Sequence, residues 1–478
     1  MSSPTPGIDL CFMEARALAA MIRRREVSVR EIMAAHLAQI GRLNPTLNAI
    51  VAKLPDEECL RLADEADQRL HHSEPVGPLH GLPIAFKDMQ AATGFPCTQG
   101  STIFRDFTPP ADSVLVERLR RAGAIPIGKT NVPEFGMGSH TYNPVYGTTV
   151  NPYDVTKTAG GSSGGAGAAL ASGMLPVADG GDLGGSLRNP ANFNNVVALR
   201  PTVGLVPISP NPLPLLGFGV NGPMARTVSD VSFLLSVMAG VDLRDPSCFP
   251  SDPSAFAAPI QAASFAGTRV AWSLDLGGLP LDTRVRTVLE AQRRIFEGLG
   301  CIVQDAVPPL SGADELFLTL RRFRSAATLG LLLPDYRNEM KAEAVSEIEM
   351  GAQLTGADIA NAMVRHAQLM ERMRDFQDTH EFIVCAVNQV PPFEAKSDWP
   401  KSIDGVKMDN YVSWMKSAYW ISATWHPAMS VPAGFTEDGL PVGIQIVGRY
   451  REDRRLLEFA YAFEQATNVG RCRPAMAT

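Results

Sequence analysis

The chain has 478 residues, of which 45% are hydrophobic and 19% are charged, a balance typical of a globular protein with a large buried core. Its formal net charge is −7, with no long run of Lys or Arg, which argues against nucleic acid or an anionic membrane as the main partner. The seven cysteines are scattered without a CxxC pair, so neither a disulfide framework nor a zinc site is predicted.

The N-terminal segment carries Asp9 and Glu14 and has no continuous apolar stretch, so we expect no secretory signal. No apolar run reaches the ~20 residues that a membrane-spanning helix needs. Together with the scattered cysteines, which fit a reducing compartment, these features predict a soluble cytoplasmic protein.

The first predicted element is a helix. Ser28 and Glu31 form a capping box at its start, and apolar residues then follow a helical period. We expect the helix to stop at Asn44-Pro45, since proline disfavours helix continuation.

From about Gly77 onward the pattern changes. Residues 84–86 form a short apolar run that predicts a buried strand, Asp112 could cap a helix that runs to Arg121 and ends at Gly123, and residues 124–127 predict another strand. Strand, helix and strand in this order indicate a βαβ unit within a largely parallel sheet.

Glycine is dense between residues 160 and 204, where the backbone must turn sharply or approach another group closely. Within this stretch we expect a small-residue helix over 166–172 and a strand over 174–178. Residues 310–385 are predicted to be rich in helix. Near the end, the apolar runs 428–431 and 442–447 flank Asp438-Gly439, which predicts a β-hairpin.

Three residues could carry chemistry. Lys87 ends a predicted strand, where ligands gather in open α/β sheets. Ser162 lies in Gly160-Gly161-Ser162-Ser163-Gly164-Gly165, and Ser186 lies in Gly184-Gly185-Ser186-Leu187-Arg188. Successive glycine N–H groups beside a serine can form an oxyanion hole.

Taken singly, these features have ordinary explanations. A glycine-rich loop is more often a turn, and a lysine at a strand end is usually a solvated charge. The segment Gly161-Ser162-Ser163-Gly164-Gly165 also fits the G-x-S-x-G nucleophile elbow. That motif needs an apolar strand before the serine, and residues 153–159 are polar, so we discount this interpretation. A phosphate-binding loop would need Lys-Ser or Lys-Thr after the glycines, and neither pair follows them here, so that interpretation is excluded.

In combination, these segments resemble the amidase signature family. The resemblance extends to the segment that leads from Gly77 to Lys87-Asp88, and to Leu199-Arg200-Pro201-Thr202. It also covers three further blocks: Gly128-Lys129-Thr130-Asn131, Gly222-Pro223-Met224-Ala225-Arg226 and Gly439-Leu440-Pro441-Val442-Gly443-Ile444-Gln445. It fades between about 310 and 425.

The resemblance implies a Ser–Ser–Lys triad. Ser186 would attack the carbonyl carbon, Ser162 would relay the proton, and Lys87 would be the base, with a cis peptide bond at Gly161–Ser162. A lysine acts as a base only when neutral, so its surroundings must lower its pKa from ~10.4. Ser163 is interpreted as a helix-capping residue that could also help to hold the oxyanion-hole loop. Asp182 and Arg188 are interpreted as a structural pair that supports the serine loop.

The resemblance also implies how a substrate would be held. The oxyanion hole would be formed by the backbone N–H groups of Leu183, Gly184, Gly185 and Ser186. We expect specificity to lie in residues 388–426, which carry a cluster of Trp, and to favour neutral substrates. The expected substrate-binding residues are Gly136, Met137, Gly138, Gln389, Phe393 and Trp399.

By resemblance, the fold is a single large α/β domain with a mixed twisted β-sheet of about eleven strands, covered by helices on both faces. N-terminal helices would cover about 10–75, the catalytic core about 76–310 and 425–470, and a variable segment about 310–425. No metal or cofactor is implied. The chain would act as a monomer or homodimer on a small-molecule amide or carbamate, without nucleic-acid or membrane partners.

The implied activity is hydrolysis of amides and anilides through an acyl-enzyme, with esters and carbamates (a urethanase-like activity) left open. Two alternatives remain. One is the A-type amidotransferase subunit that supplies ammonia for glutaminyl- or aspartyl-tRNA, and the other is a non-catalytic binding protein on the same scaffold.

Overall fold

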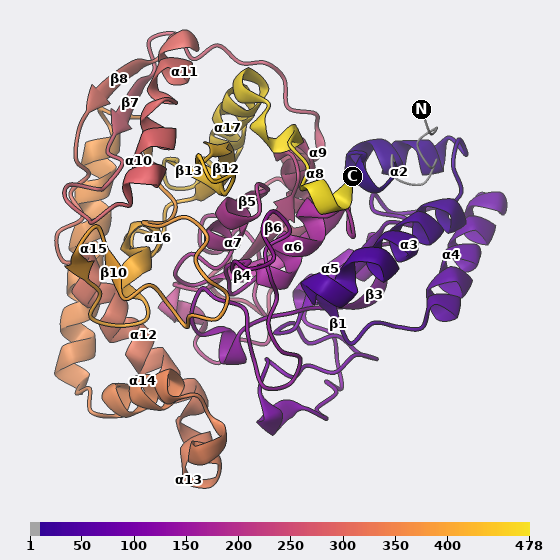
Figure 1. Ribbon diagram of the computed structural model, residues 1–478, viewed down its shortest axis with the longest axis horizontal. Coiled ribbons are helices and arrows are strands. Elements are labelled where there is room, and N and C mark those ends of the chain that lie inside the picture. Colours follow the sequence, from indigo (N-terminus) through magenta and orange to yellow (C-terminus); the bar gives the residue numbers. More distant parts are fainter. Residues whose placement is uncertain (1–9) are drawn as a thin grey trace.

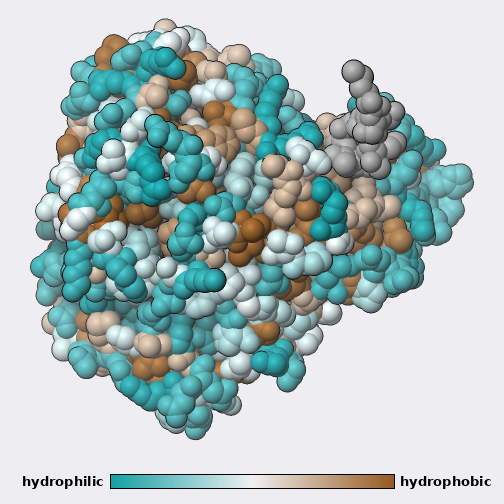
Figure 2. Space-filling view, in the orientation of Figure 1, coloured by the Kyte–Doolittle hydropathy of each residue, from teal (hydrophilic) through white to brown (hydrophobic). Residues whose placement is uncertain are grey.

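The computed structural model describes residues 10–478, so Asp9, used above against a secretory signal, lies outside the described part. Figure 1 shows the N-terminal helices on one side, strands in the middle, and the helices of residues 313–377 on the opposite side. On the face drawn in Figure 2, hydrophilic side chains cover most of the surface, and hydrophobic ones lie in small scattered groups. Of the helices within residues 10–478, none combines the length and apolarity needed to cross a membrane.

The N-terminal helices are α2 (Ala15–Arg23), α3 (Val29–Leu47) and α4 (Asp56–His71). The capping box at the start of α3 is confirmed, because the Ser28 side chain accepts from the Glu31 N–H and the Glu31 carboxylate accepts from the Ser28 N–H. The expected stop at Pro45 is wrong, since α3 continues to Leu47 and ends at Asn48 in the left-handed conformation. A proline in the last turn removes only one backbone donor.

The βαβ unit is confirmed and belongs to a three-stranded sheet in the order β1-β3-β2. Its strands β2 (Pro83–Lys87) and β3 (Ile125–Thr130) are parallel and are joined through α5 (Val114–Arg121), while β1 (Ile50–Val51) is antiparallel to β3. Ser113, rather than Asp112, caps α5. Asp112 instead accepts a hydrogen bond from the Thr93 N–H at 2.6 Å.

The larger sheet has eight strands in the order β4-β6-β5-β12-β13-β9-β7-β8. Only β7 pairs in parallel, with β8 and β9, so the sheet is mixed and the expectation of a largely parallel sheet is wrong. The predicted hairpin is confirmed as β12 and β13, whereas the strand expected over 174–178 begins at Val177 and continues through the glycines to Asp182. The strands are β4 (Val177–Asp182), β5 (Val197–Arg200), β6 (Val220–Ala225), β7 (Arg269–Trp272), β8 (Ile302–Asp305), β9 (Phe382–Ala386), β12 (Ala428–Phe435) and β13 (Pro441–Val447).

The two sheets meet at their edges, where the Lys87 N–H of β2 donates to Asp179 Oδ1 of β4 at 3.1 Å. A side-chain carboxylate thus takes the place of a strand carbonyl at this junction. The expected single α/β domain with a mixed sheet is confirmed, with its strands divided between the eight-stranded and the three-stranded sheet. A separate two-stranded ribbon pairs β10 (Ser402–Ile403) with β11 (Val406–Lys407).

Helices surround the strands, and residues 310–385 are rich in helix as predicted. The remaining helices are α6 (Gly164–Ala171), α7 (Arg188–Phe193), α8 (Val228–Met238), α9 (Ser254–Ala257), α10 (Thr283–Glu290), α11 (Arg293–Gly298), α12 (Ala313–Leu329), α13 (Leu333–Tyr336), α14 (Ala342–Ala352), α15 (Gly356–Gln377), α16 (Lys416–Ser422) and α17 (Asp453–Thr467).

Candidate active site

Lys87 is the last residue of β2 and is only 2% exposed. Its Nζ donates to Ser162 Oγ at 2.8 Å, to Ser163 Oγ at 2.9 Å and to the Gly181 carbonyl at 3.2 Å. The structure therefore brings together a lysine and two serines that are 75 and 76 residues away in the sequence.

Burial lowers the pKa of Lys87 from 10.5 to about 8, although the nearby carboxylates of Asp179 and Asp182 act in the opposite direction. Taking an ammonium out of water disfavours its charged form. The neutral amine that a general base requires therefore predominates above about pH 8.

The peptide bond between Gly161 and Ser162 is cis, as the resemblance implied. The Gly161 carbonyl accepts from Ser139 Oγ at 2.8 Å, which fixes the loop against the preceding segment. Ser163 occupies the N-cap position of α6 but makes no capping hydrogen bond with its side chain. The interpretation of Ser163 as a helix cap is therefore wrong for its hydroxyl, which is engaged by Lys87.

Ser186 lies in the loop between β4 and α7, where the chain turns at Gly185 with φ +118. The Ser163 N–H donates to the Ser186 carbonyl at 3.2 Å, so the two serine loops touch through their backbones. Ser186 is half-buried, and within residues 10–478 its hydroxyl has no hydrogen-bond partner. A Cβ at Gly184 would lie 2.7 Å from the Phe317 ring, so any larger residue there would have to displace that ring.

The backbone N–H groups of this loop divide into two sets. Those of Gly185 and Leu187 donate to the Asp182 carboxylate at 2.8 and 3.2 Å. Those of Leu183, Gly184 and Ser186 donate to no other described residue. The Gly185 N–H is thus already satisfied, and the three remaining amides are the ones available to an oxyanion.

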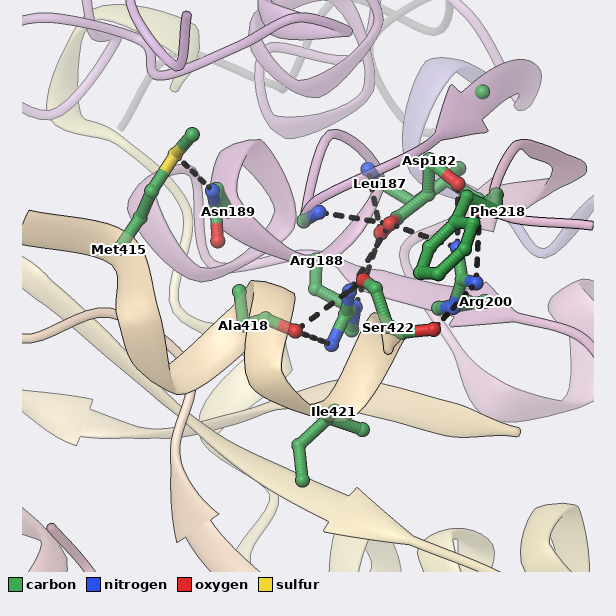
Figure 3. A network of polar contacts seen from close by, with 12 residues as sticks. Asp182, Leu187, Arg188, Asn189, Arg200, Phe218, Met415, Ala418, Ile421 and Ser422 are labelled. Carbon is green, nitrogen blue, oxygen red and sulfur yellow. Dashed lines mark hydrogen bonds and ion pairs between the residues drawn. The ribbon is translucent and has the colours of Figure 1, made fainter. Parts of the chain in front are cut away.

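A buried ion network holds the loop (Figure 3). Arg188 binds Asp182 through Nε and Nη2, both at 3.0 Å, and Arg200 Nη1 lies 3.2 Å from Asp182 Oδ1. Burial alone would raise the pKa of Asp182, but Arg188 and Arg200 hold it well below its ordinary value. Arg188 also donates to Ser422 Oγ at 2.6 Å and to Gln445 Oε1 at 2.5 Å. The structural role predicted for Asp182 and Arg188 is confirmed.

We expect Asp182→Asn to lower the free energy of unfolding by about 3–5 kcal/mol, because it leaves two buried guanidinium groups without a counter-ion. The pKa of Asp182 is depressed in the folded state. Its contribution to the free energy of unfolding is therefore complete above the ordinary pKa of Asp and is lost as the pH falls from there toward the depressed pKa. Urea unfolding at pH 7 measures the effect. Asp305→Asn is the control, since Asp305 pairs with Arg293 at the surface and is 77% exposed. Equal stability of the two variants would contradict the assignment.

A pocket lies beside the expected substrate wall and is lined by Met137, Gly138 and Trp399, among others. Gly136 adjoins the site, since a Cβ there would lie 3.5 Å from Ser162 Oγ. Of these four expected substrate-binding residues, Gly136 therefore lies beside Ser162, and Met137, Gly138 and Trp399 line the pocket.

Two other expected residues lie elsewhere. Gln389 is 1% exposed. Its Nε2 donates to the Pro280 carbonyl at 3.0 Å, and its Oε1 accepts from the Lys416 N–H at 2.7 Å. Phe393 packs edge-on against Trp414, with ring centroids 5.3 Å apart. Neither lines the pocket.

Sequence reasoning missed Lys341, which lines the same pocket from the residue before α14. Its Nζ donates to the Met137 carbonyl, and its N–H donates to the buried Glu134 carboxylate at 2.9 Å. Lys341 is separated from Met137 by 204 residues, and no local pattern in its polar helical segment marks it. Within residues 10–478, no group of three or more His, Cys, Asp or Glu side chains could hold a metal ion.

The family model described as Amidase matches residues 31–457. The acylamidase of Rhodococcus erythropolis is 33% identical over 471 residues, covering 98% of each chain. The A-type subunit of the glutamyl-tRNA(Gln) amidotransferase of Ralstonia nicotianae is 34% identical over 500 residues, covering 96% of this chain and 99% of its own.

Solved structures agree with this similarity. A bacterial aryl acylamidase of the amidase signature family superposes with a TM-score of 0.89 at 26% identity, covering 97% of this chain and 99% of its own. A 6-aminohexanoate cyclic dimer hydrolase complexed with substrate gives a TM-score of 0.87 at 26% identity, covering 98% and 100%. The chain belongs to the amidase signature family and is a hydrolase of carbon–nitrogen bonds other than peptide bonds.

Proposed function

We propose that the protein hydrolyses carboxylic amides through an acyl-enzyme, with Ser186 as nucleophile, Ser162 as proton relay and Lys87 as base. The observation that carries this proposal is the buried Lys87, whose Nζ is 2.8 Å from Ser162 Oγ beside the Ser186 loop. Membership in a hydrolase family argues against the non-catalytic alternative.

In the first half-reaction, Ser186 Oγ attacks the carbonyl carbon while its proton passes to Ser162 and the Ser162 proton passes to neutral Lys87. The carbonyl oxygen becomes an oxyanion, held by the N–H groups of Leu183, Gly184 and Ser186. The C–N bond then breaks, and the proton returns from Lys87 through Ser162 to the departing amine. Water repeats the sequence on the acyl-enzyme and releases the carboxylic acid.

The substrates that we propose are neutral amides and anilides. The similarity to the Rhodococcus acylamidase and to the bacterial aryl acylamidase supports this choice. Esters and carbamates pass through the same kind of tetrahedral intermediate, so we include them as candidate substrates.

A hydrolysis screen of the purified chain tests the proposal against its main alternative. We expect turnover of primary amides, anilides or aryl carbamates without any added protein or ATP. The A-type amidotransferase role stays a candidate because the Ralstonia protein is 34% identical over 96% of this chain. Activity that requires partner proteins would favour that alternative.

Amide hydrolysis by the free enzyme should rise with pH and level off above about pH 8. The reason is that burial lowers the pKa of Lys87 to about 8, and only the neutral amine accepts a proton. Below that pKa, kcat/KM should fall about tenfold per pH unit. The measurement is kcat/KM for an anilide between pH 6 and 10. A flat profile through pH 8 would exclude a base with this pKa.

We expect Trp399→Ala to lower kcat/KM for an anilide by a factor that corresponds to about 1–3 kcal/mol of transition-state stabilisation, since it removes an aromatic wall of the pocket. The kcat/KM for an aliphatic primary amide, which leaves the pocket unfilled, should fall less in this variant. Trp420→Ala is the control, because Trp420 bonds to Asp314 away from the pocket. If the ratio of kcat/KM for the anilide to that for the aliphatic amide is unchanged in Trp399→Ala, Trp399 has only a packing role.

A further inference from the structure

Asp179 of β4 is a fully buried carboxylate to which the reaction described above gives no part. Its Oδ1 accepts from the Lys87 N–H at 3.1 Å. Its Oδ2 is buried as well and has no hydrogen-bond partner within residues 10–478. A buried carboxylate oxygen without a donor costs free energy, so its presence beside the base calls for a role.

Strand β4 runs along the whole length of Lys87. The backbone N–H of Lys87 donates to Asp179, and its Nζ donates to the Gly181 carbonyl at 3.2 Å. A Cβ on Gly181 would lie 3.8 Å from Lys87 Nζ. Residues 179 and 181 are two apart in the strand, so their side-chain positions share one face of β4. The Asp179 carboxylate therefore lies on the face that borders the lysine side chain.

The other carboxylates near Lys87 already have partners. Asp182 is paired with the two arginines of the buried ion network. Asp88 lies 3.9 Å from Nζ of Lys129, the second buried lysine beside this junction. Within the described residues, Asp179 forms no such ion pair, and the cations that act on its pKa are Lys129 and Lys87. Asp179 is therefore the carboxylate left to balance the charge of Lys87.

The two groups hold opposite charges over a common pH range. Burial raises the pKa of Asp179 to about 6 and lowers that of Lys87 to about 8, so Asp179 is ionised where Lys87 titrates. Its negative charge raises the pKa of Lys87, because a nearby carboxylate favours the ammonium form. In the proposed reaction, this ammonium forms as Ser186 attacks and then returns its proton to the departing amine.

We propose that Asp179 is a positioning residue for the base: its carboxylate fixes Lys87 at the end of β2 and stabilises the ammonium that forms during acylation. The inference rests on the proposed function, since it takes Lys87 as the base. Asp179 acts through Lys87 and not on a reacting atom. Its loss should therefore change the pH at which Lys87 titrates, which the loss of a purely structural contact would not do.

The titration of Lys87 is measured directly by ¹³C NMR of protein labelled at the lysine ε-carbons, and the Lys87 signal is assigned by its absence from Lys87→Met. We expect a midpoint of about 8 in the wild type. In Asp179→Asn, which keeps an oxygen to accept the Lys87 N–H, the midpoint should be lower by about one pH unit or more. The pH profile of kcat/KM for an anilide should shift equally, so activity at low pH relative to the plateau should rise about tenfold.

Asp453→Asn is the matched control. Asp453 is also a buried carboxyl whose pKa burial raises to about 6, and it accepts from the Thr202 N–H at 2.8 Å, but no lysine acts on its pKa. This variant should leave the Lys87 midpoint at the wild-type value. Asp179→Glu, which keeps the charge, should return the midpoint toward that value. Asp179→Ser is a second neutral variant, and thermal melting establishes which variants are folded.

An unchanged Lys87 midpoint in a folded neutral variant would overturn the proposal, as would a midpoint that moves to higher pH. The NMR titration needs no hydrolysis, so it is repeated in Ser186→Ala, where the same shift is expected. A shifted NMR midpoint with an unshifted pH–rate profile would leave Asp179 as the group that sets the charge of Lys87 and would exclude Lys87 as the base. Failure of this inference and failure of the proposed function are thus distinguishable.

Discussion

Replacing Ser186 with alanine is expected to lower kcat on an anilide by on the order of 10⁶-fold, the scale seen when other serine hydrolases lose their nucleophile. The loss is large because Ser162 and Ser163, the two serines nearest the base, both accept from Lys87 Nζ. Ser186 differs from them in having a hydroxyl without a described partner beside three unoccupied amides. Pre-steady-state release of the amine product measures acyl-enzyme formation directly.

Two control variants make this result specific. Ser236→Ala removes a hydroxyl whose one hydrogen bond within residues 10–478 is to the Phe233 carbonyl of its own helix, so it should keep wild-type turnover. Ser163→Ala should retain more activity than Ser186→Ala, because it removes one acceptor of Lys87 and leaves the nucleophile in place. Turnover by Ser186→Ala within about tenfold of the wild type would rule out Ser186 as the nucleophile.

Replacing Lys87 with alanine is expected to cost about 10²–10⁴-fold on amides, the usual range for general acid–base assistance. An activated ester should lose less, since a good leaving group departs without a proton. The physical reason is the position of the Nζ atom, 2.8 Å from Ser162 Oγ in a buried site that lowers its pKa to about 8. The kcat/KM ratio of an anilide to its matching aryl ester measures this selectivity.

Because Lys87 is 2% exposed, alanine leaves a cavity there. Lys87→Met keeps the length of the side chain and separates the loss of the base from the loss of packing. Lys53→Ala, which breaks a pair with Asp56 at the surface, controls for the lost charge. If Lys87→Met keeps amide turnover while remaining folded, the lysine is structural.

Local sequence signals predicted local structure well. The capping box at Ser28 and the Asp438-Gly439 hairpin depend on neighbouring residues, and both are confirmed. The prediction that the helix stops at Pro45 failed because this residue lies in the last turn of α3, where one missing N–H is tolerated. The direction of the strands in the larger sheet depends on which distant strands pair, such as β5 with β12, and no short window contains that information.

In the site, too, the residues in contiguous motifs could be predicted, and those that depend on distant contacts could not. The serine and lysine segments are contiguous motifs, so the resemblance could name them, and the structure brings Lys87 and Ser162 together. The Gly185 N–H was expected in the oxyanion hole, but Asp182, three residues away, occupies it. Lys341 could not be found, because its place in the pocket depends on contacts of α14 with residues 134–137, two hundred positions away.

The most direct test of the account is the position of a covalent adduct. The protein is treated with a sulfonyl fluoride or phosphonate, digested, and the modified peptide is identified by tandem mass spectrometry. The account predicts one equivalent of label on Ser186, absent from Ser186→Ala and strongly reduced in Lys87→Met because the base is lost. Label on Ser162 or Ser163, with Ser186 unmodified, would contradict it.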